Sequence, residues 1–492
     1  MPNYPIIWQV LNPKEGSNVS NLHEECGVFG IYVPEEAPLS HYVYAGLTAL
    51  QHRGQESCGM VVNKEGLFSV HKALGLVNDV FPPAVLDQLG MGSIAIGHAR
   101  YGTTGGNELS NVQPIVVNHM KGHTALAHNG NLTNALELRS ELEASGSIFH
   151  STSDTEVISY LITRERLTAS SIAEAASRAM NKIEGAYSLV IMSPKKLIAL
   201  RDENGFRPLC YGVLPDGGYV VASETCALDA VGATYVREIE PGEIMVFDRE
   251  GIHSITDHCN KLPRSLCVFE AVYFARPDSK MDGVTIHQAR VRAGQLLAQE
   301  CPAEADVVIG VPDSGLDAAL GFAQESGIPY EMGFVKNKYI ARTFIAPGQG
   351  NREKKVNLKL NPIASTVCGK RVVLIDDSIV RGTTSKRIVK TLRDEGATEI
   401  HLRSSAPAFL NPCYYGTDVD SRENLIAVNR TNEEIAEIIG ADSVGYLSVN
   451  SVKRLLGDTP EKGYCTACFD GCYPTPEPTD TRKYRFTSSI TI

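Results

Sequence analysis

Residues 372–384 constrain the fold of this chain more than any other stretch. They begin with the apolar run Val-Val-Leu-Ile, which is typical of a strand buried on both faces of a parallel sheet. Asp376 and Asp377 follow where that strand would end, and open parallel sheets bind ligands at the carboxyl ends of their strands. A hydroxyl-rich turn with a glycine leads into a predicted helix at 385–395. The stretch therefore predicts an α/β fold with a ligand site at one edge of its sheet.

The same stretch combines groups that bind a phosphate with groups that repel one. Backbone N–H groups of the turn, and of the first turn of the helix, can bind a phosphate without a cation. The carboxylates of Asp376 and Asp377 repel an anion and suit ribose hydroxyls or a hydrated Mg²⁺ instead. Together these groups indicate a phosphorylated ribose. The alternative that needs no ligand is a buried strand ending in a polar turn.

This stretch resembles the phosphoribosyl-diphosphate (PRPP) signature of the type I phosphoribosyltransferases. The resemblance implies an α/β domain with a parallel sheet, in which the two aspartates contact ribose and Mg²⁺ and residues 378–384 enclose the 5′-phosphate. The implied PRPP-binding residues of this stretch are Asp376, Asp377, Ser378, Arg381, Gly382, Thr383 and Thr384. A second loop, Pro-Asp-Ser-Gly at 312–315, would face the pyrophosphate, which makes Ser314 a candidate Mg²⁺ ligand.

Length, charge and cysteine content set limits on the whole protein. A chain of 492 residues predicts two or three domains. Its net charge of −11 argues against a general nucleic-acid binder, and no apolar stretch reaches the length of a membrane span. The N-terminus lacks the pattern of a signal or transit peptide. Twelve cysteines in so long a chain do not indicate a disulfide framework, so we expect a cytoplasmic protein that uses thiols for catalysis or metal binding.

Cys26 begins a predicted strand with the sequence Cys-Gly-Val-Phe-Gly, and a cysteine in that position is usually a small buried apolar residue. Several polar clusters that abut later strand-like segments change this interpretation. They lie at 51–57, 97–101, 127–132 and 153–156. In this order after Cys26 they resemble the N-terminal-nucleophile glutamine amidotransferases, over roughly 26–260. The resemblance implies an α+β glutaminase domain built as an αββα sandwich.

The resemblance assigns each polar cluster a role in glutamine hydrolysis. Cys26 would attack the carboxamide carbon, while the Asn129 side chain and the Gly130 backbone N–H would form an oxyanion hole. Arg100 would bind the α-carboxylate of glutamine in a bidentate manner, and Asp154 would pair with its α-ammonium group. Arg53 is a further implied glutamine-binding residue.

In this family the catalytic base is the free α-amino group of the nucleophile itself. Such a group has a pKa of roughly 7.7–8.0, which suits a base near neutral pH. As encoded, Cys26 has an amide nitrogen, which carries no basic lone pair. Residues 1–25 are therefore predicted to be a propeptide that is removed by cleavage between Glu25 and Cys26.

A domain boundary is predicted near 255–265, because alternating strands and helices replace the strand-rich pattern beyond it. We expect a phosphoribosyltransferase domain at 261–450. Residues 336–359 are strongly basic in an acidic chain, with an Ala-Pro-Gly-Gln-Gly segment at their centre. The simple alternative is a solvated charge run. Beside the phosphate loops, the pattern favours a lid that closes over PRPP, excludes water and brings Tyr339 and Arg342 to the pyrophosphate.

Cys465 and Cys468 form a Cys-x-x-Cys pair, which alone is compatible with zinc, an iron–sulfur cluster or redox chemistry. With Cys267 and Cys413, these cysteines resemble the [4Fe–4S]-containing branch of the glutamine PRPP amidotransferases. The resemblance implies that the four thiolates hold a cluster that ties the terminal segment, 451–492, onto the core. Cys472 has no place in this ligand set.

Both halves thus resemble one family. The resemblance implies that ammonia released from glutamine passes through an internal channel and displaces pyrophosphate from PRPP, giving 5-phosphoribosylamine in the first step of purine synthesis. It also implies a homotetramer inhibited by purine nucleotides. One alternative couples the glutaminase to another acceptor, such as a hexose phosphate. Another is a non-catalytic PRPP-binding regulator.

Overall fold

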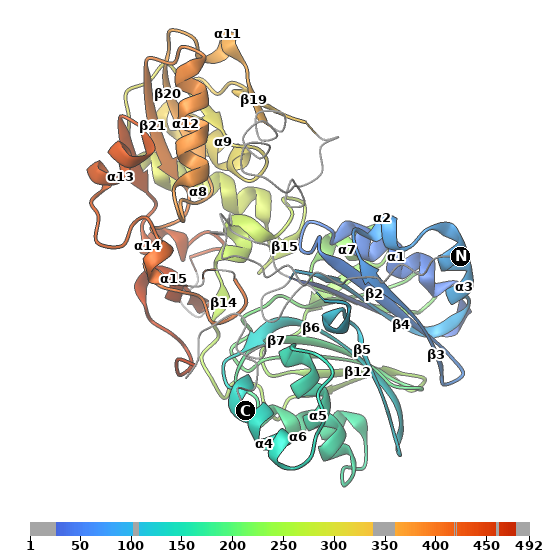
Figure 1. Ribbon diagram of the computed structural model, residues 1–492. Helices are drawn as coiled ribbons and strands as arrows, with labels where there is room; N and C mark the ends of the chain where they lie inside the picture. Colours follow the sequence, from blue (N-terminus) through green and yellow to red (C-terminus); the bar gives the residue numbers. More distant parts are fainter. Residues whose placement is uncertain are drawn as a thin grey trace, which may run out of the picture.

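The computed structural model describes residues 26–101, 108–337, 360–417, 419, 421–458 and 462–478. The two halves of the chain form separate layered bodies, coloured blue to green and yellow to red in Figure 1. No helix in these ranges is long and apolar enough to cross a membrane.

The first half contains two antiparallel sheets packed face to face. The seven-stranded sheet has the order β11-β9-β10-β1-β4-β2-β3 and the six-stranded sheet the order β13-β12-β8-β7-β6-β5. The strands of the first sheet are β1 (Gly27–Ala37), β2 (Ser57–Lys64), β3 (Leu67–Leu74), β4 (Gly92–Arg100), β9 (Cys210–Val213), β10 (Tyr219–Ala222) and β11 (Thr234–Glu238). Those of the second are β5 (Ile115–His119), β6 (Gly122–Leu132), β7 (Gly185–Met192), β8 (Leu197–Arg201), β12 (Ile244–Asp248) and β13 (Gly251–Ile255).

Helices cover the outer face of each sheet. A buried core that includes Val61 and Val190 lies between the sheets, and two further cores lie outside them. The first sheet packs against α1 (Leu39–Ala49), α2 (Val77–Val80), α3 (Pro83–Leu89) and α7 (Thr225–Ala230), and the second against α4 (Ala135–Ala144), α5 (Asp154–Arg166) and α6 (Ile172–Met180). This is the predicted αββα sandwich.

The second half contains a parallel sheet with helices on both faces, as predicted. Its order is β17-β20-β21-β22. The strands are β17 (Val307–Gly310), β20 (Arg371–Asp376), β21 (Glu399–Ser404) and β22 (Ser443–Tyr446). Alternate residues of β20 face opposite cores, formed with α8 (Ile286–Glu300) and α9 (Gly315–Ser326) on one side and with α12 (Thr383–Asp394) and α13 (Asn432–Ile439) on the other.

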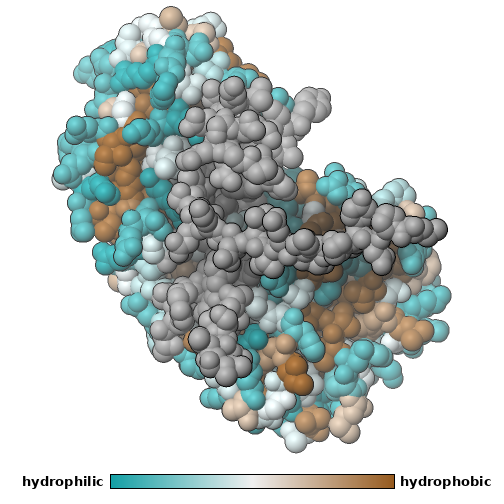
Figure 2. Space-filling model, viewed as in Figure 1, coloured by the Kyte–Doolittle hydropathy of each residue, from teal (hydrophilic) through white to brown (hydrophobic). Residues whose placement is uncertain are grey.

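Apolar side chains also gather on the surface of the first half. Brown surface covers part of the body formed by the N-terminal half in Figure 2. The edge strand β3 leaves Leu67, Val70 and Leu74 exposed.

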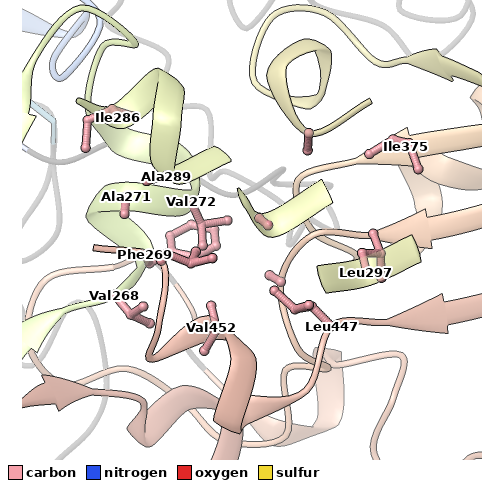
Figure 3. Close-up of a cluster of buried hydrophobic side chains, with 14 of the residues drawn as sticks. Val268, Phe269, Ala271, Val272, Ile286, Ala289, Leu297, Ile375, Leu447 and Val452 are labelled. Carbon is pink, nitrogen blue, oxygen red and sulfur yellow. The ribbon is translucent and has the colours of Figure 1, made fainter. Parts of the chain in front are cut away.

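Short elements join the two halves and end the described chain. β14 (Leu266–Cys267) pairs in parallel with β23 (Tyr464–Cys465), so distant segments meet there. Figure 3 shows Phe269 and Val272, just after β14, in one cluster with Ala289 of α8 and with Val452. The remaining elements are η1 (Leu109–Asn111), the π-helical turn η2 (Glu270–Phe274), β15 (Lys280–Met281), β16 (Val284–Thr285), β18 (Phe334–Lys336), β19 (Leu360–Pro362), α11 (Ala364–Val367), η3 (Arg422–Asn424), α14 (Val449–Val452) and α15 (Ala467–Asp470).

Candidate active sites

Cys26 lies immediately before β1 and is buried. Its Sγ donates a hydrogen bond to the backbone oxygen of Tyr101 at 3.3 Å. Because Gly27 pairs with Ala99, the end of β4, including Arg100, lies beside Cys26. Arg100 is also buried, and its Nη1 lies 3.7 Å from Oε2 of Glu56. The structure thus brings the predicted nucleophile and the predicted carboxylate-binding arginine together, at the same end of the neighbouring strands β1 and β4.

Asn129 and Gly130 lie on β6, in the facing sheet. His98 Nε2 hydrogen-bonds the His128 backbone oxygen at 3.0 Å, and His98 pairs with Val28, two residues beyond Cys26. This contact joins the two sheets near the nucleophile and places Asn129 at the same end.

The Asn129 amide is unusual because it is wholly buried and, within the part of the chain that the structure describes, neither Oδ1 nor Nδ2 has a hydrogen-bond partner. An unpaired buried polar group costs about 1–3 kcal/mol, so a ligand oxygen is a natural partner for Nδ2. The adjacent Gly130 has a φ of +140°, and an added Cβ would lie 2.1 Å from the Ala186 backbone oxygen. Only glycine fits there, which leaves the backbone beside Asn129 free of a side chain.

Asp154 is the first residue of α5 and is buried. Its Oδ2 accepts a hydrogen bond from the Leu132 N–H at 3.0 Å, and its Oδ1 lies 3.7 Å from His128 Nδ1. Burial lowers the pKa of His128, although the Asp154 carboxylate opposes this shift, so the ring is neutral near pH 7. Asp154 therefore brings a negative charge to the site that suits the ammonium group of an amino acid.

Arg53 does not occupy the position expected of a glutamine ligand. Its side chain is completely buried, and its Nε donates to the Cys26 backbone oxygen at 3.0 Å. Nη1 donates to Glu224 Oε1 at 2.6 Å and to Glu270 Oε2 at 2.9 Å, and Nη2 to Glu270 Oε1 at 2.8 Å. The guanidinium group is thus committed to protein partners. The prediction that Arg53 binds glutamine is replaced by a role in holding the main chain of the nucleophile.

This buried group is completed by three residues for which the sequence predicts no chemistry: Glu224, Glu270 and Arg207. A signal was present for Glu270, since it is the only charged residue in an otherwise apolar run at 266–274. A lone carboxylate in such a run is buried only when it is paired.

In the second half, Asp376 is the last residue of β20, and Asp376 and Asp377 are both less than a tenth exposed. Ser314, from the loop before α9, donates its hydroxyl to Asp377 Oδ2, and Ser378 donates to Asp377 Oδ1 at 2.6 Å. The structure thereby brings the predicted Mg²⁺ ligand Ser314 to the predicted aspartates. Lys336 also lies near these residues and donates a hydrogen bond to Asp313, which precedes Ser314.

The two carboxylates destabilise one another as anions. Burial raises the pKa of Asp376 well above its usual value, and the charge of Asp377 raises it further. Burial also raises the pKa of Asp377, against hydrogen bonds from Ser314 and Ser378 and the charge of Arg290. A divalent cation between these oxygens would favour both charged forms. The donor set therefore fits Mg²⁺.

The loop after Asp377 ends at the start of α12. Gly382 has a φ of +74°, and an added Cβ would lie 2.3 Å from Ile426 Cδ1, so a side chain is excluded at this turn. Thr383 and Thr384 begin α12, two residues before the predicted start, and Arg381 precedes the glycine. The N-terminus of α12 can therefore bind an anion. Tyr339 and Arg342 lie outside the described residues.

Four of the twelve cysteines come together between the two halves. Cys267 lies opposite Cys465 in the β14–β23 pair, and the backbone oxygen of Cys468 accepts hydrogen bonds from Leu410 and Asn411, just before Cys413. Burial raises the pKa of the Cys465 and Cys468 thiols, and the neighbouring thiols, including Cys267 and Cys413, raise it further. Cys472, by contrast, is exposed.

Comparisons with known proteins match both halves of this architecture. A glutamine amidotransferase domain model matches residues 103–230, and a phosphoribosyl transferase domain model matches residues 282–420. The amidophosphoribosyltransferase of Bacillus subtilis is 48% identical over 469 residues, which are 94% of this chain and 97% of that protein. The chain belongs to the amidophosphoribosyltransferase family.

Further relatives support the same family assignment. The amidophosphoribosyltransferase of Methanocaldococcus jannaschii is also 48% identical, over 92% of this chain and 98% of its own. A solved structure described as the allosteric regulatory enzyme of purine biosynthesis has a TM-score of 0.88 and 47% identity, over 95% of this chain and all of that one. The B. subtilis glutamine PRPP amidotransferase, solved in complex with ADP and GMP, has a TM-score of 0.86 and 47% identity, over 93% of this chain and 99% of that one.

As a member of this family, the chain is an enzyme that aminates PRPP with nitrogen from glutamine, the first step of purine biosynthesis. It forms 5-phosphoribosylamine and releases glutamate and pyrophosphate. The predicted fold class, reaction and substrates are confirmed. The alternative of a non-catalytic PRPP-binding regulator is not supported, and neither is a hexose phosphate acceptor.

Proposed function

We propose that Cys26 hydrolyses glutamine and that the ammonia crosses an internal channel to PRPP bound at Asp376 and Asp377. The observation that carries the first assignment is the buried amide of Asn129, which has no partner among the described residues. In this proposal Asn129 and the Gly130 N–H bind the oxyanion, Arg100 binds the α-carboxylate and Asp154 binds the α-ammonium group. Arg53 fixes the main chain of Cys26.

Replacing Asn129 with alanine is expected to lower kcat for glutamine hydrolysis by about 10²- to 10³-fold, the usual effect of losing one oxyanion-hole donor. Steady-state release of glutamate measures this loss. Synthesis from added ammonia bypasses the glutaminase site and is expected to be unchanged.

Asn63→Ala is the matched control. Asn63 is also completely buried, but its amide is satisfied, since Nδ2 donates to the Pro194 backbone oxygen at 3.0 Å and Oδ1 accepts from the Gly66 N–H at 2.8 Å. This control should lose stability rather than glutaminase kcat. Normal glutaminase kcat in the Asn129 variant would contradict the oxyanion role.

At the second site, residues 378–384 would bind the 5′-phosphate of PRPP, with the N-terminus of α12 supplying backbone N–H groups. Asp376 and Asp377 would contact the ribose and, with Ser314, Mg²⁺. The cation would neutralise the departing pyrophosphate. Tyr339 and Arg342 remain predicted pyrophosphate contacts on a lid.

We also propose that Cys267, Cys413, Cys465 and Cys468 hold a [4Fe–4S] cluster with a structural role. Among the described residues, no three of these sulfurs lie within 4.8 Å of one another. Tetrahedral Zn²⁺ with Zn–S bonds of about 2.3 Å would hold its sulfurs about 3.8 Å apart. Four cysteine thiolates are the usual ligand set of a [4Fe–4S] cluster.

Cys468→Ser is expected to abolish bound iron and acid-labile sulfide, to remove the brown colour and to lower the melting temperature, because the terminal segment loses its tie to the core. Metal and sulfide analysis of the purified protein measures this. Cys472→Ser, which changes a nearby exposed thiol outside the proposed ligand set, is the control that should retain the cluster. Stoichiometric zinc without iron in the unmodified protein would contradict the assignment.

Further properties belong to the same proposal. Inhibition by purine nucleotides is supported by the ADP and GMP bound to the B. subtilis relative. A homotetramer is part of the proposal because the family resemblance implies it. We further propose a cytoplasmic location and a division into a propeptide (1–25), a glutaminase domain (26–260), a phosphoribosyltransferase domain (261–450) and a terminal segment (451–492).

A further inference from the structure

The backbone oxygen of Cys26 is hydrogen-bonded to Arg53, which belongs to a buried group of four charged side chains. Arg53, Glu224, Glu270 and Arg207 all have completely buried side chains. Arg53 lies between the two glutamates, and Arg207 Nη1 donates to Glu270 Oε1 at 3.3 Å. Burial opposes the charged form of Arg53, but the carboxylates of Glu270 and Glu224 outweigh it and raise its pKa. The positive and negative charges of the group balance.

One member of this group comes from outside the proposed glutaminase domain. Glu270 begins η2, in the segment that leads from β14 to α8. The carbonyl groups of this turn are held by Arg290 of α8, which donates to the oxygens of Ala271, Tyr273 and Ala275 at 3.1, 2.9 and 2.8 Å. The position of Glu270 is therefore set by the second half of the protein.

Glu270 fixes the Arg53 guanidinium more completely than any other partner. It accepts from both Nη1 and Nη2, which fixes the plane of the group and leaves Nε directed at the Cys26 oxygen. Glu224 contacts only Nη1, and its other oxygen accepts from the Arg276 N–H at 2.9 Å and the Ser279 hydroxyl at 2.6 Å. Without Glu270 the guanidinium would lose the pair of bonds that orients it.

We propose that Glu270 is a positioning residue for glutamine hydrolysis, acting on Cys26 through Arg53. The glutaminase site is then completed by a residue that the phosphoribosyltransferase half holds in place. The Glu270 side chain is completely buried and paired with Arg53 and Arg207, so its removal is expected to alter the orientation of the nucleophile and not the groups that bind glutamine. A misplacement of about 1 Å is enough to reduce catalysis about 10²-fold. This inference rests on the proposed role of Cys26.

The test is Glu270→Gln in the mature full-length enzyme with its metals. The amide keeps the shape of the side chain but loses the charge and one acceptor. We expect kcat for glutamine hydrolysis to fall about 10- to 100-fold, with KM for glutamine and ammonia-dependent synthesis both unchanged. Glu243→Gln is the matched control, because Glu243 is a buried carboxylate paired with Arg237 at 2.7 and 2.8 Å and is not bonded to this group. It should leave both reactions unchanged.

Arg53→Lys keeps the buried positive charge but cannot bond Cys26 and Glu270 in the same geometry, so it should lose glutaminase kcat in the same way if Glu270→Gln does not fold. Full glutaminase kcat in either folded variant would overturn the inference. Equal losses of glutamine- and ammonia-dependent synthesis would also overturn it, because they would show a general structural role. If Cys26→Ala kept its glutaminase activity, the proposed function itself would fail, which is a separate result.

Discussion

The chain with an intact Glu25–Cys26 bond is expected to show no measurable glutaminase activity, and removal of residues 1–25 is expected to create it. The physical reason is the missing base. In the proposed mechanism the free α-amino group of Cys26 accepts the thiol proton, and general-base catalysis contributes about 10²- to 10⁴-fold. The position of Cys26 reinforces this, since its thiol is buried and donates to the Tyr101 carbonyl, which is too weak a base to take the proton.

The experiment compares glutamate release before and after cleavage, with the mass of each form measured. Ammonia-dependent synthesis of 5-phosphoribosylamine should be present in both forms, because the second site lies in the other half of the chain. Cleaved Cys26→Ala is the control and should lack only the glutamine reaction. Rapid turnover of glutamine by a form whose mass shows the bond intact would refute the assignment of the base.

Replacing Asp376 and Asp377 with asparagine is expected to abolish synthesis with both glutamine and ammonia. The double variant loses the carboxylates proposed to hold ribose and Mg²⁺. Losing a buried charged contact costs about 2–5 kcal/mol, so two such losses should lower kcat/KM by at least about 10³-fold. Initial rates of pyrophosphate release at saturating ammonia measure the effect without involving the glutaminase site.

Stability should change in the opposite direction, which separates lost function from lost folding. Burial and mutual repulsion raise the pKa of Asp376 above its value in the unfolded chain. Such a group binds protons more readily in the folded state, so it lowers stability once the pH exceeds the unfolded value of about 3.9. Without ligand at neutral pH, the double variant should therefore have a higher free energy of unfolding.

Asp394→Asn is the control for both measurements, since Asp394 lies at the exposed end of α12 and pairs only with Lys390 at 2.6 Å among the described residues. It should keep synthesis and stability close to those of the unmodified enzyme. Undiminished synthesis by the double aspartate variant would remove Asp376 and Asp377 from the reaction.

Local patterns in the sequence are enough to predict the parallel sheet and the phosphate loop. The run 372–375 lies within β20 and the helix after it is α12, because a buried strand, paired carboxylates and a glycine turn are all encoded within one short stretch. The predicted helix start is two residues late. Gly382 adopts the left-handed conformation directly before Thr383, and the hydroxyl residues that resemble a loop form the first turn of the helix.

Contacts between distant segments could not be predicted in the same way. The partners of Arg53 are Glu224 and Glu270, more than 170 residues away along the chain. Nothing near Arg53 in the sequence distinguishes an arginine that binds substrate from one that binds buried carboxylates. The four thiols were grouped only by resemblance, because the sequence does not show that β14 pairs with β23.

The pairing of β14 with β23 means that part of the fold can form only late in translation. Cys267 lies opposite Cys465 in this strand pair, and Arg207 donates to the Tyr415 carbonyl at 2.8 Å. In each contact, one residue is synthesised well before the other. An incomplete nascent chain cannot form these contacts, even after its first two sheets have emerged. The β14–β23 pair and the contact between Arg207 and Tyr415 can therefore form only when translation is nearly finished.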